Sequence, residues 1–151
     1  MEGVIMNENE ERDHLQNLAV EADAHQRRAQ DIQNQMQTLQ MLEVEMEKTE
    51  EALKNLKEGK NALFNLGSGM FISGEMKDTN KILVNVGSNI LIEMNVDNAL
   101  RFTTERKKEV SEAKEELIKG MQAISVRLNE IDTEARAIIK KVKGLESAGG
   151  A

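Results

Sequence analysis

The chain has 151 residues, of which 31% are charged and only 2% are aromatic, and 20 basic against 27 acidic residues give a net charge of −7. The absence of cysteine excludes a disulfide-stapled module and a cysteine-ligated metal site. The acidic balance argues against nucleic acid as a partner, and the lack of any apolar run near ~18 residues argues against a membrane span. Because residues 1–12 are mostly polar and acidic, we expect no secretory signal and a cytoplasmic protein.

The first predicted element is a long helix from about Asn9 to Glu58, a stretch without glycine or proline. Its apolar residues recur at steps of 3 and 4, the spacing of a coiled-coil seam. Two successive steps of 3 around Leu39 predict a stammer, where the supercoil is overwound. Gly59 is the predicted C-terminal cap. The predicted seam consists of Leu15, Leu18, Ala22, His25, Ala29, Ile32, Met36, Leu39, Leu42, Met46, Thr49, Leu53 and Leu56.

The sequence predicts β structure over residues 61–95, because glycines return there and charged residues become sparse. Three groups of turn-forming residues separate the strand-like runs, namely 67–69, 77–80 and 87–89. Short strands joined by tight turns are typical of a meander or a pair of hairpins. The four predicted strands are Ala62–Leu66, Met70–Met76, Lys81–Val86 and Ile90–Met94.

A second long helix is predicted from Asn95 or Asp97, either of which can cap a helix, to about Leu145. Two successive steps of 4 around Leu117 predict a stutter, where the coil is unwound. Gly144 is the predicted end, followed by a frayed tail. The predicted seam consists of Val110, Ala113, Leu117, Met121, Ile124, Leu128, Ile131, Ala135, Ile138, Val142 and Leu145.

Two helical arms of nearly equal length, joined by a compact β segment, predict an antiparallel two-helix coiled coil. The fold class is therefore mainly α with a small β part, divided into a helix over 1–60, two hairpins over 61–95, and a helix with a short tail over 96–151. A β segment of about 35 residues cannot bury enough apolar surface alone, and its edge strands invite pairing with other chains. We therefore expect an obligate oligomer in which strands from several subunits form a sheet or barrel.

No group of residues predicts catalysis, a cofactor or a metal site. His14 and His25 lie too far apart along one helix to share a metal ion. The Gly67-Ser68-Gly69 turn lacks the Gly-Lys-Ser/Thr ending of a phosphate-binding loop. We therefore expect a protein that is not an enzyme.

Three apolar residues lie off the predicted seams near the free end of the coil, namely Val20, Val126 and Ile139. Single apolar residues are common on protein surfaces and need no special role. The same residues are also suited to bind the exposed hydrophobic surface of another protein. Sequence physics alone leaves both interpretations open.

The middle segment resembles the two-hairpin signature of prefoldin alpha-class subunits. The resemblance is carried by Leu66-Gly67-Ser68-Gly69-Met70-Phe71-Ile72-Ser73-Gly74-Glu75, then Asp78, and then Lys81-Ile82-Leu83-Val84-Asn85-Val86-Gly87. Ala99 and Phe102 fit the same pattern, and the long charged arms without cysteine look archaeal. The sequence departs from the pattern at Asn65, where proline is common, and at Asn89-Ile90, where glycine and an aromatic residue are common.

The resemblance implies an ATP-independent co-chaperone in which two alpha and four beta subunits assemble through a double β-barrel. Non-native client proteins would bind at the tips of the coiled coils and pass to a group II chaperonin, with no nucleic acid or membrane involved. The alternative is an alpha-class relative that self-associates into filaments or a scaffold. The oligomerisation hairpins would use Gly67, Gly69, Phe71, Gly74, Ile82, Val84, Val86 and Gly87. Distal client contacts would fall on Leu15, Leu18, Val20, Ile138, Ile139 and Val142.

Overall fold

The computed structural model describes residues 7–56 and 58–149. Residues 1–6 and 57 of the predicted first helical segment, and residues 150–151 of the predicted tail, lie outside the described residues. The chain divides into two compact units. We call Met1–Thr38 with Lys114–Ala151 the helical unit, and Leu39–Ala113 the hairpin unit.

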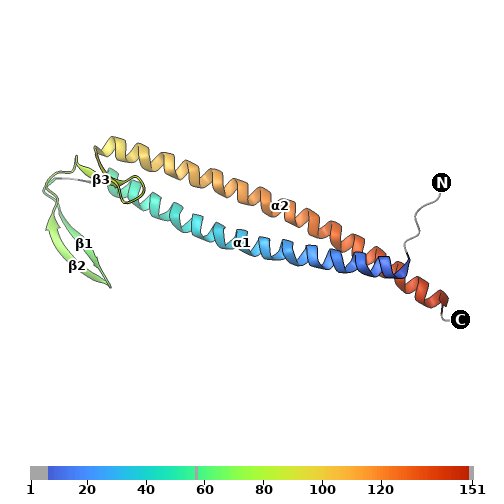
Figure 1. Ribbon diagram of the computed structural model, residues 1–151. Helices are drawn as coiled ribbons and strands as arrows, with labels where there is room; N and C mark the ends of the chain where they lie inside the picture. The colour runs from blue at the N-terminus through green and yellow to red at the C-terminus, as the bar shows by residue number, and fades with distance from the viewer. Residues whose placement is uncertain (1–6, 57, 150–151) are drawn as a thin grey trace. The chain divides into compact units, whose positions relative to one another are not determined.

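Two long helices, α1 (Glu8–Lys54) and α2 (Val96–Gly149), stand on either side of four short strands in the chain order. In each unit the α1 and α2 segments run antiparallel and side by side (Figure 1). The predicted fold class, two long antiparallel helices with two β-hairpins between them, is confirmed.

The helix α1 begins at a reciprocal cap. The Asn7 side-chain oxygen accepts a hydrogen bond from the Glu10 N–H at 2.9 Å, and a Glu10 carboxylate oxygen accepts one from the Asn7 N–H at 3.2 Å. This pairing satisfies two donors that a helix start leaves free. The other end of α1 differs from the prediction, because Gly59 is not the cap. Its N–H donates to the Met76 carbonyl at 2.9 Å, so Gly59 belongs to the base of the first hairpin.

The helix α2 is capped by Asn95 rather than Asp97. The Asn95 side-chain oxygen accepts a hydrogen bond from the Asn98 N–H at 2.8 Å. The predicted end at Gly144 is wrong, because the helix continues to Gly149. An interior glycine costs a helix only about 1 kcal/mol relative to alanine, which is too little to end it.

Both helices carry an unbroken seam in which buried and half-buried residues recur at alternating steps of 4 and 3. The predicted stammer and stutter are therefore absent. Glu43 and Glu50 take the seam positions expected for Leu42 and Thr49, and Lys114 takes the one expected for Ala113. The α1 seam consists of Glu11, Leu15, Leu18, Ala22, His25, Ala29, Ile32, Met36, Leu39, Glu43, Met46, Glu50 and Leu53. The α2 seam consists of Val96, Leu100, Thr103, Lys107, Val110, Lys114, Leu117, Met121, Ile124, Leu128, Ile131, Ala135, Ile138 and Val142.

Charged residues can occupy a seam because their aliphatic stems pack while their charged ends reach water or a partner. In the hairpin unit, the half-buried Glu50 carboxylate lies 3.5 Å from the Lys107 ammonium and accepts a hydrogen bond from the Thr104 hydroxyl at 3.4 Å. Lys107 also lies 3.7 Å from Glu47. These contacts join α1 to α2 within this unit.

The strands form two separate two-stranded antiparallel sheets. They are β1 (Asn61–Gly67) with β2 (Met70–Glu75), and β3 (Ile82–Asn85) with β4 (Leu91–Met94). All four predicted strands are present, each within one residue of its predicted bounds.

The two hairpins have the same kind of turn, and the second turn follows the first by twenty residues. The turns are Asn65-Leu66-Gly67-Ser68-Gly69 and Asn85-Val86-Gly87-Ser88-Asn89. In each, the asparagine side-chain oxygen accepts a hydrogen bond from the glycine N–H two residues on, at 2.7 and 3.0 Å. The two residues at each tip have positive φ, 50° and 77° in the first turn and 51° and 60° in the second. Such turns match the twist of paired strands. Asn89 replaces glycine here because asparagine tolerates positive φ.

The first hairpin has a close contact at Gly74. A Cβ atom at this residue would lie 2.7 Å from Cε2 of the Phe64 ring, so the ring lies over the glycine. Gly74 pairs with Ala62 in the register, which places Phe64 diagonally across the two strands.

We expect Gly74→Ala to displace the Phe64 ring and to lower the free energy of unfolding by about 1 kcal/mol or more. The neighbouring exposed residue offers a matched control, and Ser73→Ala should be nearly neutral. In a Phe64→Val background the Gly74→Ala change should cost less, because the colliding ring is gone. Equal costs of Gly74→Ala in the two backgrounds would show that the ring contact does not constrain this residue.

Candidate functional site

The six predicted distal contact residues all lie in the helical unit, but the structure separates them into two groups. Leu18 and Ile138 are buried with Ile131 in a small apolar cluster, and Leu15 and Val142 pack against it. Two residues remain on the surface, Val20 with 65% and Ile139 with 43% of its area exposed. While the helices stay paired, only these two are open to another molecule, and the binding role of all six stays a prediction.

Further exposed apolar side chains lie on α2 in the same unit. Val126, which lies off the predicted seam, is 59% exposed. Ile118 and Leu145 are also exposed, although Leu145 was predicted to lie in the seam. Single apolar side chains on two helices can make weak contacts with an apolar partner, but they enclose no reacting atoms.

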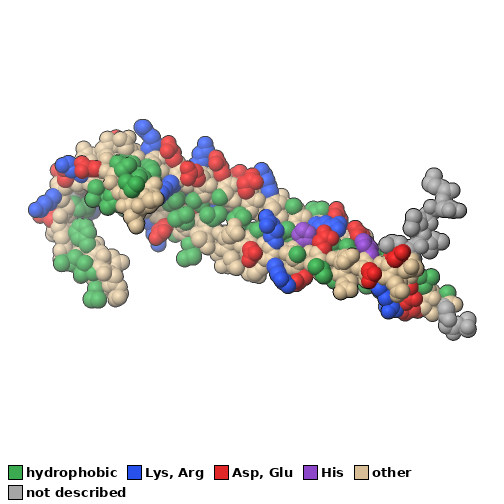
Figure 2. Space-filling model, in the orientation of Figure 1, with side chains coloured by type: hydrophobic (Ala, Val, Ile, Leu, Met, Phe, Trp, Pro, Cys, Tyr) green, Lys and Arg blue, Asp and Glu red, His purple; other side chains and the backbone are tan. Residues whose placement is uncertain are grey.

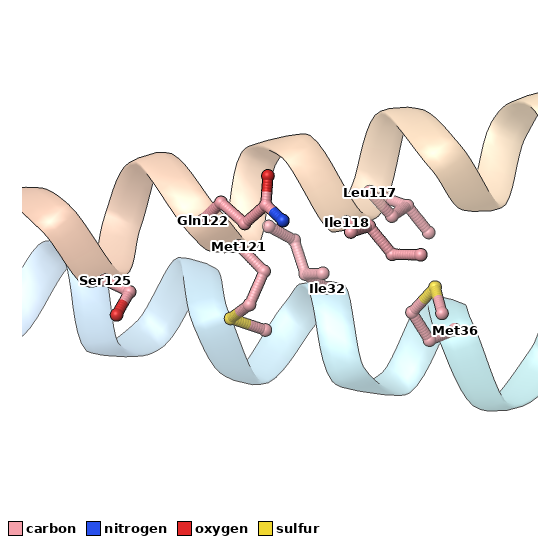
Figure 3. A pocket seen from close by; sticks show the side chains of 7 residues that line it. All are labelled: Ile32, Met36, Leu117, Ile118, Met121, Gln122 and Ser125. Atoms are coloured by element: carbon pink, nitrogen blue, oxygen red, sulfur yellow. The ribbon is translucent and has the colours of Figure 1, made fainter.

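An apolar groove of about 440 Å³ opens between the helices of this unit (Figure 3). Met36 and Met121 reach into it from opposite helices, beside Ile32 (Figure 3). Methionine side chains are flexible and adapt to differently shaped partners. Gly120 lies next to this groove, where a Cβ atom would be 3.4 Å from Cδ1 of Ile32, so Gly120 is a point of close helix contact. The lining residues are Ile32, Met36, Leu117, Ile118, Met121, Gln122 and Ser125.

Ion pairs link the two helices near the apolar cluster of Leu18, Ile131 and Ile138, and Arg127 takes part in several of them. Its guanidinium donates two hydrogen bonds to the Glu21 carboxylate, at 2.6 and 2.9 Å. It also lies 3.2 Å from Glu130 and 3.6 Å from Glu134 on its own helix. The hydrogen bond from Arg127 lowers the pKa of Glu21, and the bond to Glu21 raises the pKa of Arg127. Both side chains are therefore held in their charged forms.

The two histidines join this network instead of forming a metal site. His25 Nε2 lies 3.5 Å from Glu21, and His14 Nε2 lies 3.7 Å from Glu134. Among the described residues, no group of three or more histidine, aspartate or glutamate side chains is placed to hold a metal ion. Figure 2 shows the histidines among basic and acidic side chains on the helices.

Sequence reasoning missed a buried carboxylate at the start of α1. Glu11 is only 2% exposed, and its carboxylate accepts a hydrogen bond from the Lys141 ammonium at 3.1 Å. Nearby, Arg12 of α1 lies 3.2 Å from Glu146 of α2. The signal was available, because Glu11 lies four residues before Leu15 in the heptad spacing. A seam defined by apolar residues alone leaves Glu11 out.

The hairpins form the second candidate surface, since they expose more large apolar side chains than two small sheets can cover. Residues on both faces of the first hairpin are affected: Leu63, at 72% exposure, and Phe71, at 59%, lie on one face, and Ile72, at 54%, lies on the other. Exposed apolar surface of this extent marks an interaction site. The exposed residues are Leu63, Phe64, Leu66, Met70, Phe71, Ile72, Leu83, Ile90, Leu91 and Ile92, and Figure 2 shows apolar side chains over the hairpins.

The predicted oligomerisation residues divide by role within these hairpins. Gly67, Gly69 and Gly87 have positive φ and shape the turns. Ile82, Val84 and Val86 are half-buried, and the first two line a cavity of about 380 Å³ between β3 and the helices. The same cavity is lined by Ala99 and Phe102, and the Arg106 guanidinium lies 4.7 Å from the Phe102 ring centre. This packing holds the second hairpin against the helix bases.

Over the residues that the structure describes, neither helix has a stretch long and apolar enough to cross a membrane.

Comparison with known proteins gives one consistent family. A model of the prefoldin subunit family matches residues 25–141. The prefoldin subunit alpha of Thermofilum pendens is 33% identical over 72% of this chain and 86% of its own length. The prefoldin subunit alpha of Pyrococcus horikoshii is 30% identical over 84% of this chain and 88% of its own length. A chain of the filamentous PFD from Methanocaldococcus jannaschii, solved by cryo-electron microscopy, has a similar fold, with a TM-score of 0.68 over 75% of this chain and 96% of its own, at 20% identity.

The lowered pKa of Glu21 predicts a pH-dependent contribution to the stability of the helix pair. A carboxylate whose folded-state pKa is depressed stabilises the protein fully above the ordinary pKa of glutamate. That contribution is lost as the pH falls through the lowered value. We expect Glu21→Gln to lower the melting temperature at neutral pH, and this difference from the unaltered protein to close on acidification.

Asp132→Asn is the matched control for this experiment, because among the described residues the ion-pair partner of Asp132 is Arg136 of the same helix. It should change the melting temperature less at every pH. A Glu21→Gln deficit that persists unchanged into acid would mean that packing, and not the charge, is responsible.

Proposed function

We propose that this chain, which belongs to the prefoldin family and to its alpha class, is a subunit of an ATP-independent holdase that captures unfolded client proteins. The family consists of chaperones without enzymatic activity, and this agrees with the absence of a catalytic arrangement in the sequence. The observation that carries the proposal is the set of exposed apolar side chains on both helices of the helical unit.

Client capture by these side chains would be weak and multivalent. Val20, Val126 and Ile139 are exposed singly, so each covers only a small apolar area of a client. Several such contacts around one client raise the overall affinity because, after the first contact, the others are intramolecular. The seam residues Leu18 and Ile138 add to this surface only when the helices separate.

The hairpins would join the subunits. Residues 61–95 expose apolar side chains and strand edges that suit pairing with hairpins of beta-class subunits, in an assembly of two alpha and four beta chains. The segments 1–60 and 96–151 would then serve as the arms that hold clients. Such a subunit would act in the cytoplasm and release its clients to a group II chaperonin that competes for the same surface.

The alternative is a self-associating alpha-class protein that forms filaments or a scaffold. It is favoured by one finding, the fold similarity to a protein that is itself described as filamentous. Exposed hairpin edges are compatible with both closed and open assemblies.

The two assemblies differ in mass. We expect this chain, mixed with a beta-class subunit, to give a closed particle of two alpha and four beta chains by native mass spectrometry. Phe71→Ser should weaken that particle, because it replaces an exposed aromatic residue of the hairpin with a small polar one. Open-ended oligomers of this chain alone, unaffected by the beta-class subunit, would support the filament instead.

Client capture can be tested on the complete assembly with the double variant Val20→Ser and Ile139→Ser. The concentration that halves aggregation of a denatured protein, without nucleotide, should rise by about threefold or more because two apolar contacts are lost. Val44→Ser is the control. Val44 is also an exposed valine of α1, at 49%, but it lies in the hairpin unit. Equal protection by the double variant and the control would show that the exposed distal residues do not bind the client.

A further inference from the structure

Two methionines take seam positions in the helical unit. Met36 of α1 and Met121 of α2 are half-buried, and they are the only methionines among the described residues of this unit. The buried seam residues next to them are Ile32 and Ile124. Methionine is unbranched and flexible, so it defines the packing of a seam less tightly than isoleucine does. The seam is open at this point, in the groove of about 440 Å³ that both methionines line.

The groove gives a small solute a path to both thioethers. Met36 and Met121 reach into it from opposite helices (Figure 3), and neither side chain is fully buried. Hydrogen peroxide is little larger than a water molecule, so a groove of this volume has room for it. The oxidant can therefore contact these side chains while the helices stay paired.

We infer that Met36 and Met121 form an oxidation site, at which a peroxide converts both thioethers to sulfoxides and loosens the pairing of α1 with α2 in the helical unit. A sulfur lone pair attacks one oxygen of hydrogen peroxide, so an S–O bond forms as the O–O bond breaks. The sulfur is oxidised and the peroxide is reduced, and the departing hydroxide takes the proton of the transferred oxygen and leaves as water. Such a site requires only the helix pair, so it is independent of the proposed function.

The lining of the groove is poorly suited to a sulfoxide. Five of its seven residues are apolar, and the two polar ones, Gln122 and Ser125, both belong to α2. The lining residues from α1 are Ile32 and Met36, so α1 supplies no side-chain donor there. A sulfoxide oxygen is a polar acceptor, and burying it without a donor costs free energy. The oxidised side chains therefore turn toward water, and their apolar contacts across the seam are lost.

Other methionines of the chain supply the control and determine the kind of measurement. Met41, further along α1, is 74% exposed and lies off the seam, so its oxidation removes little packing. Met46, Met76 and Met94 of the hairpin unit are half-buried, and their oxidation can disturb that unit. The effect of the groove methionines must therefore be measured locally, at the residues around the groove.

Access to the site is tested by treating the complete assembly with hydrogen peroxide. Peptide mapping by mass spectrometry follows the gain of one oxygen atom at each methionine. Met36 and Met121 should be oxidised in the folded assembly at rates within about tenfold of the rate at the exposed Met41. Slower oxidation of either residue would show that the groove does not admit the oxidant, and it would overturn the site.

Loosening of the helix pair is measured by hydrogen exchange of the backbone amides of residues 29–38 and 114–125, which surround the groove. These amides should exchange about fivefold faster or more after oxidation, because helix pairing protects them. The double variant Met36→Leu with Met121→Leu should keep slow exchange after the same treatment, since leucine has a similar volume and no sulfur. Met41→Leu is the matched control and should give no protection.

Reduction of the sulfoxides supplies a second test, which needs no variant. Treatment of the oxidised assembly with both methionine sulfoxide reductases, one for each sulfoxide epimer, should restore slow exchange around the groove. If the double variant does not assemble, this reversal in the unaltered protein is the deciding measurement. Exchange that stays fast after reduction, that accelerates equally in the double leucine variant, or that stays slow once both sulfoxides have formed would overturn the inference.

Discussion

The pairing of two helices along one narrow seam is the constraint on which the rest of this chain depends. Two helices bury only the residues that recur at steps of 4 and 3, so few side chains in the helical unit are shielded from water. Leu18, Ile131 and Ile138 form a cluster far smaller than the core of a compact domain. Among the described residues of the helical unit no third element covers the other apolar side chains of the helices, so these remain exposed beside the open groove.

The hairpins differ from the helices, because they carry more apolar side chains than their two-stranded sheets can bury. A two-stranded sheet is at best marginally stable in water. The repeated Asn-x-Gly-Ser turn gives each hairpin a defined twist and register, so it presents a preformed apolar face. Packing of β3 near Ala99 and Phe102 covers part of the second hairpin only, and Leu83 and Leu91 stay exposed. Association with other chains is the physical way to cover the remainder.

The fold could be predicted closely because its main signals are local. Heptad spacing and the absence of glycine predicted both helices, and the turn-forming residues predicted every strand. The predicted bounds agree with the observed ones within a residue or two, apart from the two helix C-termini. The predictions at Leu42 and Ala113 are wrong because apolar character alone does not define a seam position, and the half-buried residues there are Glu43 and Lys114. The cross-helix partners of Glu11 and Glu21 could not be predicted, since they depend on the register between helices, which spacing along one helix does not define.

The distal helices bury few apolar residues, and this suits the reversible binding that the proposed function requires. Covering an exposed valine or isoleucine contributes about 1–2 kcal/mol, which is too little for one site to hold a client alone. In the proposed function several sites together would hold it, yet each would open independently, so a competitor would replace them one at a time. A deep pocket would bind more tightly and would favour one sequence. In the proposed function, narrow helix pairing, ionic rather than apolar at Glu21 and Arg127, would therefore give both breadth of recognition and release without a separate energy source.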